Sequence, residues 1–167
     1  DETTDPIVPQ VRAMDAINPR DEGFKMALAG GVTTAVTCPG NANPIGGTCA
    51  AIKTTGNTVE EMVMVPEIAI KMCLADGVKN TYGGKRSPLT RLGTAALIRE
   101  ALMKAKRYHD QWTASQKDPA NKPPKFDMKL HALMRVFDGM PVKFIAKRGH
   151  DMMTAVRIAE EFGLTYT

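Results

Sequence analysis

Several side chains able to do chemistry follow a predicted strand over residues 141–146. The loop at residues 147–151 contains Arg148 and His150, and a neutral imidazole in such a place could bind a metal or transfer a proton. A simpler alternative is that His150 joins Asp151 in capping the next helix, and the sequence alone favours this structural role.

A second group of polar residues surrounds the end of a predicted strand over residues 67–73. Asp76 could ligate a metal, and Lys71 could do so after carboxylation of its amine. Arg91 starts a long helix after a glycine-rich turn that opens at Tyr82, so it could bind an anionic group together with the helix N-terminus. The ordinary alternatives are a turn aspartate, a solvated lysine and an arginine in a surface ion pair.

The third candidate is the loop at residues 39–47, rich in glycine and proline, which contains Asn43. It follows a β-branched segment at residues 32–37, and in parallel α/β folds the carboxyl ends of strands carry ligands and catalytic groups. Asn43 can also hold a left-handed turn, and this is its leading explanation. The sequence has no HxH, HExxH or cysteine cluster, and GGVTTAV lacks the spacing of a dinucleotide-binding loop.

Hydrophobic periodicity and turn residues predict the elements that position these groups. Helices and strands alternate over much of the chain, which favours right-handed βαβ units and a parallel sheet. The fold class is therefore α/β, about half of a (β/α)₈ barrel. The expected strands are a buried one at residues 32–37 and others at 48–53, 59–65 (closed by Pro66), 67–73, 141–146 and from 164. One helix is expected to end at Gly30, and three others to begin at Pro88, after Asp127 and after Asp151.

Composition excludes several classes of function. The chain has 167 residues, 43% hydrophobic and 24% charged, which suits one globular domain with a sizeable core. A net charge of +4 without a basic run, and 5% aromatic residues, argue against nucleic-acid binding. No segment is typical of a membrane span or a signal peptide. Three cysteines without CxxC spacing indicate buried thiols in a reducing, cytoplasmic compartment.

The ends suggest a piece of a longer polypeptide. The chain begins at Asp1 without an initiator methionine and stops where a strand opens at Leu164. We therefore expect residues 1–167 to form a partial barrel domain with no second domain. Such a half barrel has two open sheet edges and needs the rest of its own chain or another subunit, for example in a homo-oligomer.

Four segments resemble a known family. They are DETTDPIVPQVRAMDAINP, FKMALAGGVTTAVTCPGNANPIGGTCAAIKTTG, YGGKRSPLTRLGTAALIREALMKAKRY and DMMTAVRIAEEFGL. Together they resemble the imidazolonepropionase-like branch of the amidohydrolase superfamily. The resemblance implies a distorted (β/α)₈ barrel that hydrolyses amide or related C–N bonds of a small-molecule substrate. It also implies a divalent metal, usually zinc, that activates a water, and a later aspartate as general base.

The sequence departs from this family at its metal ligands. Relatives have HAHR-x-DD where residues 145–151 read IAKRGHD, so Ile145 and Lys147 replace two histidines. The family's HxH pair would precede Asp1, and its catalytic aspartate would lie beyond Thr167. Either His150 substitutes from a shifted position, or metal binding is weakened or altered.

The resemblance assigns candidate roles to the residues present. Asp76, in place of the glutamate of the family's GEN turn, and His150 are the candidate metal ligands. No catalytic residue is assigned within the chain. A competing hypothesis is a non-catalytic amidohydrolase-like barrel kept for binding or assembly, and a third is a small phosphate-binding α/β protein. The candidate substrate-binding residues are Arg148, Tyr82, Asn43 and Arg91.

Overall fold

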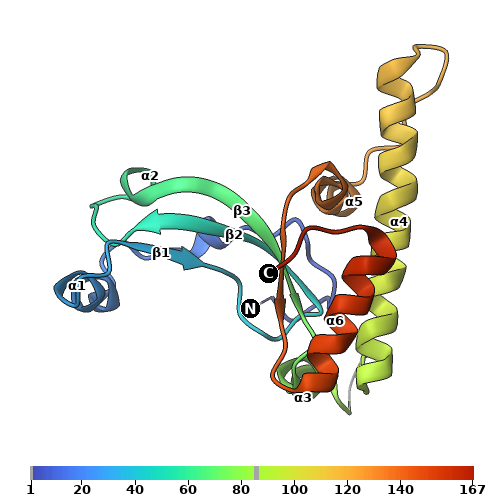
Figure 1. Cartoon of the computed structure of the whole chain (residues 1–167). Coiled ribbons are helices and arrows are strands. Elements are labelled where there is room, and N and C mark those ends of the chain that lie inside the picture. Colours follow the sequence, from blue (N-terminus) through green and yellow to red (C-terminus); the bar gives the residue numbers. More distant parts are fainter. Residues whose placement is uncertain (1, 85–86) are drawn as a thin grey trace.

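The computed structural model describes residues 2–84 and 87–167, in which a curled four-stranded sheet packs against helices (Figure 1). The sheet is continuous in the order β1-β2-β3-β4. The elements are η1 (Ala13–Ala16), α1 (Glu22–Ala29), β1 (Thr34–Thr37), β2 (Ile45–Lys53), α2 (Val59–Met62), β3 (Val63–Cys73), α3 (Asp76–Tyr82), α4 (Arg91–Lys117), α5 (Met128–Met134), η2 (Arg135–Asp138), β4 (Val142–Ile145) and α6 (Gly149–Phe162).

The sheet is mixed, so the predicted all-parallel pairing is wrong for its first three strands. β1 pairs with β2 and β2 with β3 in antiparallel fashion, whereas β3 and β4 are parallel. The reason is the length of the connections, because antiparallel neighbours can be joined by short loops but parallel ones need a crossover of a dozen or more residues. Between β3 and β4 the chain makes that crossover through α3, α4, α5 and η2. A curled mixed sheet of this kind is consistent with part of a barrel.

β3 replaces the two strands predicted at residues 59–65 and 67–73. Thr58 accepts a hydrogen bond from Glu61 N (3.3 Å) and so begins the short helix α2 where a strand was expected. The strand then runs through Pro66, opposite a register shift between Cys49 and Ala51 on β2. A bulge tolerates proline because the local ladder has already lost its regular hydrogen bonds.

The main core lies between the sheet and the helices α4, α5 and α6 (Figure 1). α4 packs one face on this core, since Ala95, Ile98, Leu102 and Ala105 are all buried. The helix begins at Arg91 rather than at Pro88, because Thr90 Oγ1 caps it by accepting from Gly93 N (3.1 Å). No helix among the described residues is both long and apolar enough to cross a bilayer.

The far end of the sheet projects away from the helical layer, with α1 beside it (Figure 1). β1 was predicted to be buried, but its residues alternate between exposed and half-buried, and Val36 is 51% exposed. The reason is that β1 lies at the sheet edge and only one of its faces is packed, where Ala35 joins Phe24 of α1 in a small core cluster. At the opposite edge, residues 165–167 hydrogen-bond to β4, and Tyr166 forms an isolated parallel bridge with Val142 where a strand from Leu164 was expected.

Candidate functional site

The carboxyl ends of β3 and β4 bring together charged side chains from three elements. The two strands run in parallel to Cys73 and Ile145, which are register partners. Just beyond these ends, α3 begins at Asp76 and α6 at Gly149, and α4 returns to the same place with its first residue, Arg91. The strand-end cluster consists of Asp76, Arg91, Arg148, His150 and Asp151.

Asp76 is the anionic centre of one half of this strand-end cluster. Its Oδ2 atom lies 2.9 Å from Arg148 Nη2, and its Oδ1 lies 3.3 Å from Lys79 Nζ and 3.7 Å from Arg91 Nη2. One carboxylate therefore faces three cations, while Arg148 remains half exposed. This excess of positive charge suits recognition of an anionic or carbonyl oxygen.

Asp151 is the anionic centre of the other half. Its side chain is only 5% exposed, and its Oδ1 lies 3.5 Å from Arg91 Nε and 3.3 Å from His150 Nε2. The prediction that Asp151 caps α6 is wrong, because the helix starts earlier and Arg148 occupies the cap position. Asp151 lies in the first turn instead, where the positive end of the helix stabilises a carboxylate.

The residues present do not fit a metal ion. The described residues contain no group of three or more histidine, cysteine, aspartate or glutamate side chains arranged to hold one. Asp76 is paired with cations, and His150 Nε2 lies 2.5 Å from Arg91 Nη1. A guanidinium so close to both candidate ligands would repel a divalent cation, so we derive no step through a metal at this place.

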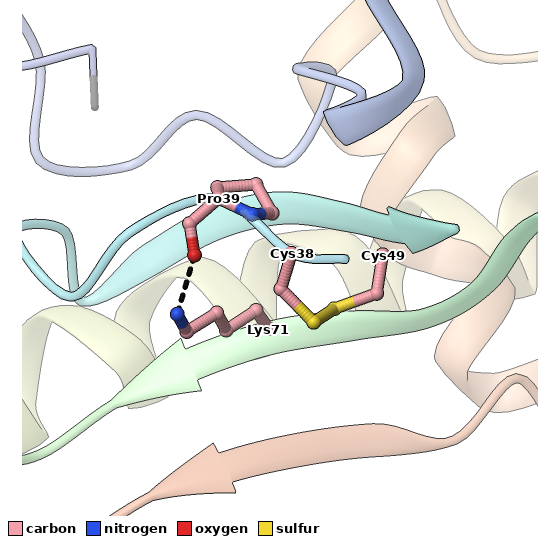
Figure 2. Close-up of a disulfide and its surroundings, with 4 residues drawn as sticks. All are labelled: Cys38, Pro39, Cys49 and Lys71. Carbon is pink, nitrogen blue, oxygen red and sulfur yellow. Dashed lines mark hydrogen bonds between the residues drawn. A yellow bond between two sulfur atoms is a disulfide. The ribbon is translucent and has the colours of Figure 1, made fainter. Parts of the chain in front are cut away.

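A second polar feature lies on the face of the sheet that points away from the helical core. Lys71 is 6% exposed and its Nζ donates a hydrogen bond to the carbonyl oxygen of Pro39, beside the disulfide between Cys38 and Cys49 (Figure 2). Burial lowers the pKa of the Lys71 amine, against a smaller upward effect of Cys73, and the neighbouring Lys143 adds a still smaller downward effect. The hydrogen bond to the Pro39 carbonyl thus offsets part of the free-energy cost of burying the Lys71 amine.

The disulfide corrects the prediction of three free thiols. Cys38 and Cys49 are bonded across the β1–β2 hairpin, next to the register pair of Thr37 and Ala50, and only Cys73 is free and buried among the described residues. An odd cysteine count does not exclude a pair, which the sequence reasoning missed. Because disulfides persist in oxidising environments, cysteine usage no longer supports a cytoplasmic location.

Asn43 and Tyr82 contact each other, and among the described residues no hydrogen bond joins either of them to the strand-end cluster. Asn43 Nδ2 donates to the carbonyl oxygens of Glu2 (2.6 Å) and Asp5 (2.8 Å) and to Tyr82 Oη (3.0 Å). The Tyr82 hydroxyl donates to Asp5 O (3.2 Å), and both side chains are 2% exposed. These bonds fasten the N-terminal segment to the glycine-rich loop and α3, so both residues have a structural role in this structure.

The structure therefore unites four of the six candidate site residues, Asp76, Arg91, Arg148 and His150, and sets two apart. Sequence reasoning missed Lys79 and the buried role of Asp151 as members of this arrangement. A signal existed for Lys79, since three residues separate it from Asp76 on a helical segment.

Two known proteins are similar to this chain in sequence or in structure. A crystal structure of an amidohydrolase from Thermotoga maritima MSB8 is 39% identical and superimposes with a TM-score of 0.93, over 99% of this chain and 43% of that one. Amidohydrolase tasK of Hapsidospora irregularis is 30% identical over 126 residues, which are 66% of this chain and 13% of that protein. No protein-family model matches the chain.

A mixed α/β sheet with charged side chains gathered at its strand ends is an arrangement typical of enzymes. This chain is related to the amidohydrolases. It spans less than half the length of either relative.

Proposed function

We propose that the full-length protein is a hydrolase that cleaves a non-peptide C–N bond, an amide or cyclic amide, in a small molecule. The observation that carries the proposal is the close superposition on the Thermotoga maritima amidohydrolase, at 39% identity over 99% of this chain. The position of the strand-end cluster at the carboxyl ends of β3 and β4 supports it, because this is where barrel enzymes bind substrates.

Within this proposal, Arg148 and Arg91 bind the substrate. The Arg148 side chain is 52% exposed and that of Arg91 38%, so a ligand can reach both guanidinium groups. They would hold a carboxylate or a developing negative charge on the carbonyl oxygen, which is worth more where water is partly excluded. Asp76 orients both arginines by its ion pairs.

A divalent metal, usually zinc in this family, belongs to the proposal only for the full-length protein. It would activate the attacking water, and its ligands would come from segments outside residues 1–167. Those segments, or another subunit in a homo-oligomer, would also cover the open β1 edge. A cytoplasmic location stays a prediction.

The test is an assay of the purified full-length protein, loaded with zinc, on N-acyl amino acids and cyclic amides. We expect turnover of at least one class, and a loss of about 100-fold in kcat/KM when Arg148→Met removes a charge-assisted contact in the transition state. Arg107→Met removes an exposed arginine on α4 and serves as the matched control. The absence of turnover across the panel, with metal bound, would favour the non-catalytic barrel instead.

A further inference from the structure

The disulfide and the buried amine of Lys71 meet at one short segment of the chain. Cys38 is bonded to Cys49 on β2, and the next residue, Pro39, accepts a hydrogen bond from Lys71 Nζ (Figure 2). Among the described residues, the Pro39 carbonyl is the only hydrogen-bond acceptor of this amine. The covalent bond therefore holds in place the group on which the amine depends.

Lys71 has little else to stabilise its charge. The residue is 6% exposed and makes no ion pair with the described residues. Its register partner on β4 is Lys143, so the charge beside it is also positive. A buried ammonium group without a counter-ion depends on its hydrogen bonds, because a desolvated donor left unpaired is costly. If the Pro39 carbonyl moves away, Lys71 must turn to water or to another acceptor.

The disulfide is the main fastening of the segment that contains Pro39. Residues 38–42 make no backbone-to-backbone hydrogen bond with the described residues outside the strand ladder. Beyond them, the Asn43 side chain holds the chain through its bonds to Glu2, Asp5 and Tyr82. Breaking the disulfide would therefore leave residues 38–41 held only at their two ends, by the β1 strand and by Asn43.

The two sulfurs of the bond differ in access. Cys38 is half-buried and follows β1, the strand at the sheet edge. Cys49 is 0% exposed and lies on β2, between β1 and β3. Thiol–disulfide exchange requires a thiolate to reach one sulfur of the bond. A thiol that approaches from solvent therefore meets Cys38 first.

We propose that the bond between Cys38 and Cys49 is a redox-sensitive switch that controls the availability of the Lys71 amine. A small thiol such as glutathione attacks Cys38 as its thiolate, the sulfur–sulfur bond breaks, and the electron pair leaves on Cys49 Sγ, which takes a proton from water. A second thiol then releases Cys38, so two thiols are oxidised to one disulfide while two cysteine thiols form. The freed residues 38–41 move the Pro39 carbonyl away from Lys71. The switch is independent of the proposed hydrolysis, because no substrate bond takes part in it.

Acid-quenched mass spectrometry of the full-length protein tests the exchange step. In a buffer of reduced and oxidised glutathione, wild type should carry glutathione on Cys38 about tenfold or more in excess over Cys49. With oxidised glutathione, the Cys49→Ala variant should be modified at Cys38, whereas Cys49 in the matched Cys38→Ala variant should stay free. Preferential modification of Cys49, or no modification of Cys38 in the Cys49→Ala variant, overturns the proposal.

Limited acetylation of the full-length protein tests the link to Lys71. Acetic anhydride should modify Lys71 about fivefold faster after reduction of wild type, the factor expected for one lost hydrogen bond. The variant with both Cys38→Ala and Cys49→Ala should show the fast rate with and without reductant. Lys117, an exposed residue at the end of α4, should react equally in every sample. Equal acetylation of Lys71 in oxidised and reduced wild type overturns the proposal.

Cys73 distinguishes a local change from unfolding. It is free and buried, so iodoacetamide should leave it unmodified in both oxidised and reduced wild type. A Cys73 thiol that becomes reactive on reduction would mean that the disulfide maintains the whole fold, and this result would overturn a switch confined to residues 38–41.

Discussion

Arg91 Nη1 lies 2.5 Å from His150 Nε2, although 59 residues separate the two in the sequence. A guanidinium has only donors, so the contact is a hydrogen bond when the imidazole nitrogen accepts it. The same arginine reaches Asp76 and Asp151, and it therefore joins α3, α4 and α6 at the strand ends.

Arg91 should contribute to stability through the buried Asp151. Arg91→Met leaves that carboxylate with His150 as its one remaining charged partner among the described residues, so we expect the free energy of unfolding in urea to fall by about 2 kcal/mol. Adding Asp151→Asn should recover part of the loss, because the stranded charge is removed. If the double variant is no more stable than Arg91→Met alone, Arg91 does not stabilise the protein through the charge of Asp151.

The ion pair of Glu67 and Arg135 should make stability depend on pH. Arg135 donates hydrogen bonds of 2.5 and 3.1 Å to the Glu67 carboxylate and, against an opposing effect of burial, holds its pKa below the ordinary 4.5. A carboxylate with a lowered folded-state pKa stabilises the fold above its unfolded pKa, and this stability is lost as pH falls through the folded value.

Glu67→Gln should therefore lower stability by about 1–2 kcal/mol at neutral pH and by progressively less below about pH 5. Urea unfolding followed from neutral to acidic pH measures the difference. Glu60→Gln changes an exposed glutamate and is the control. Parallel stability curves for wild type and Glu67→Gln would contradict the prediction.

The disulfide between Cys38 and Cys49 should stabilise the β1–β2 hairpin. Closing a loop with a sequence separation of 11 is worth about 3 kcal/mol in the chain-entropy description. The paired Cys38→Ala and Cys49→Ala variant should lose about that amount relative to the oxidised protein. Mass spectrometry of an unreduced digest should find the Cys38 and Cys49 peptides linked, and recovery of both as free thiols would refute the bond.

Gly47 should be irreplaceable for steric reasons. It has φ +103°, and a Cβ atom there would collide with the carbonyl oxygen of Val11, which accepts a hydrogen bond from Thr48 N (2.8 Å). Gly47→Ala should cost about 3 kcal/mol or more. Gly139→Ala shares a positive φ of +94° but meets nothing within 4 Å, so it should cost only about 1 kcal/mol. Similar losses for both would show that the collision is relieved.

The sequence predicted the helices better than the strands. Asp127 caps the helix α5 that was expected after it, because a cap needs only a side chain and the amides two or three residues further on. The strand boundaries around Pro66 were wrong, since α2 and a bulge in β2 decide where β3 starts. The predicted parallel direction was also wrong for β1, β2 and β3, because direction depends on which strands become neighbours.

The sequence by itself determined the relationship to amidohydrolases, the α/β class and the candidate residues near Asp76 and His150. Local patterns and motif similarity suffice for these, since each depends on residues close together in the chain. Only the tertiary structure decided that Arg91 stands between the two candidate metal ligands, that Asn43 holds Tyr82, and that Cys38 pairs with Cys49. Those outcomes depend on contacts between distant segments, whose register and burial no local pattern encodes.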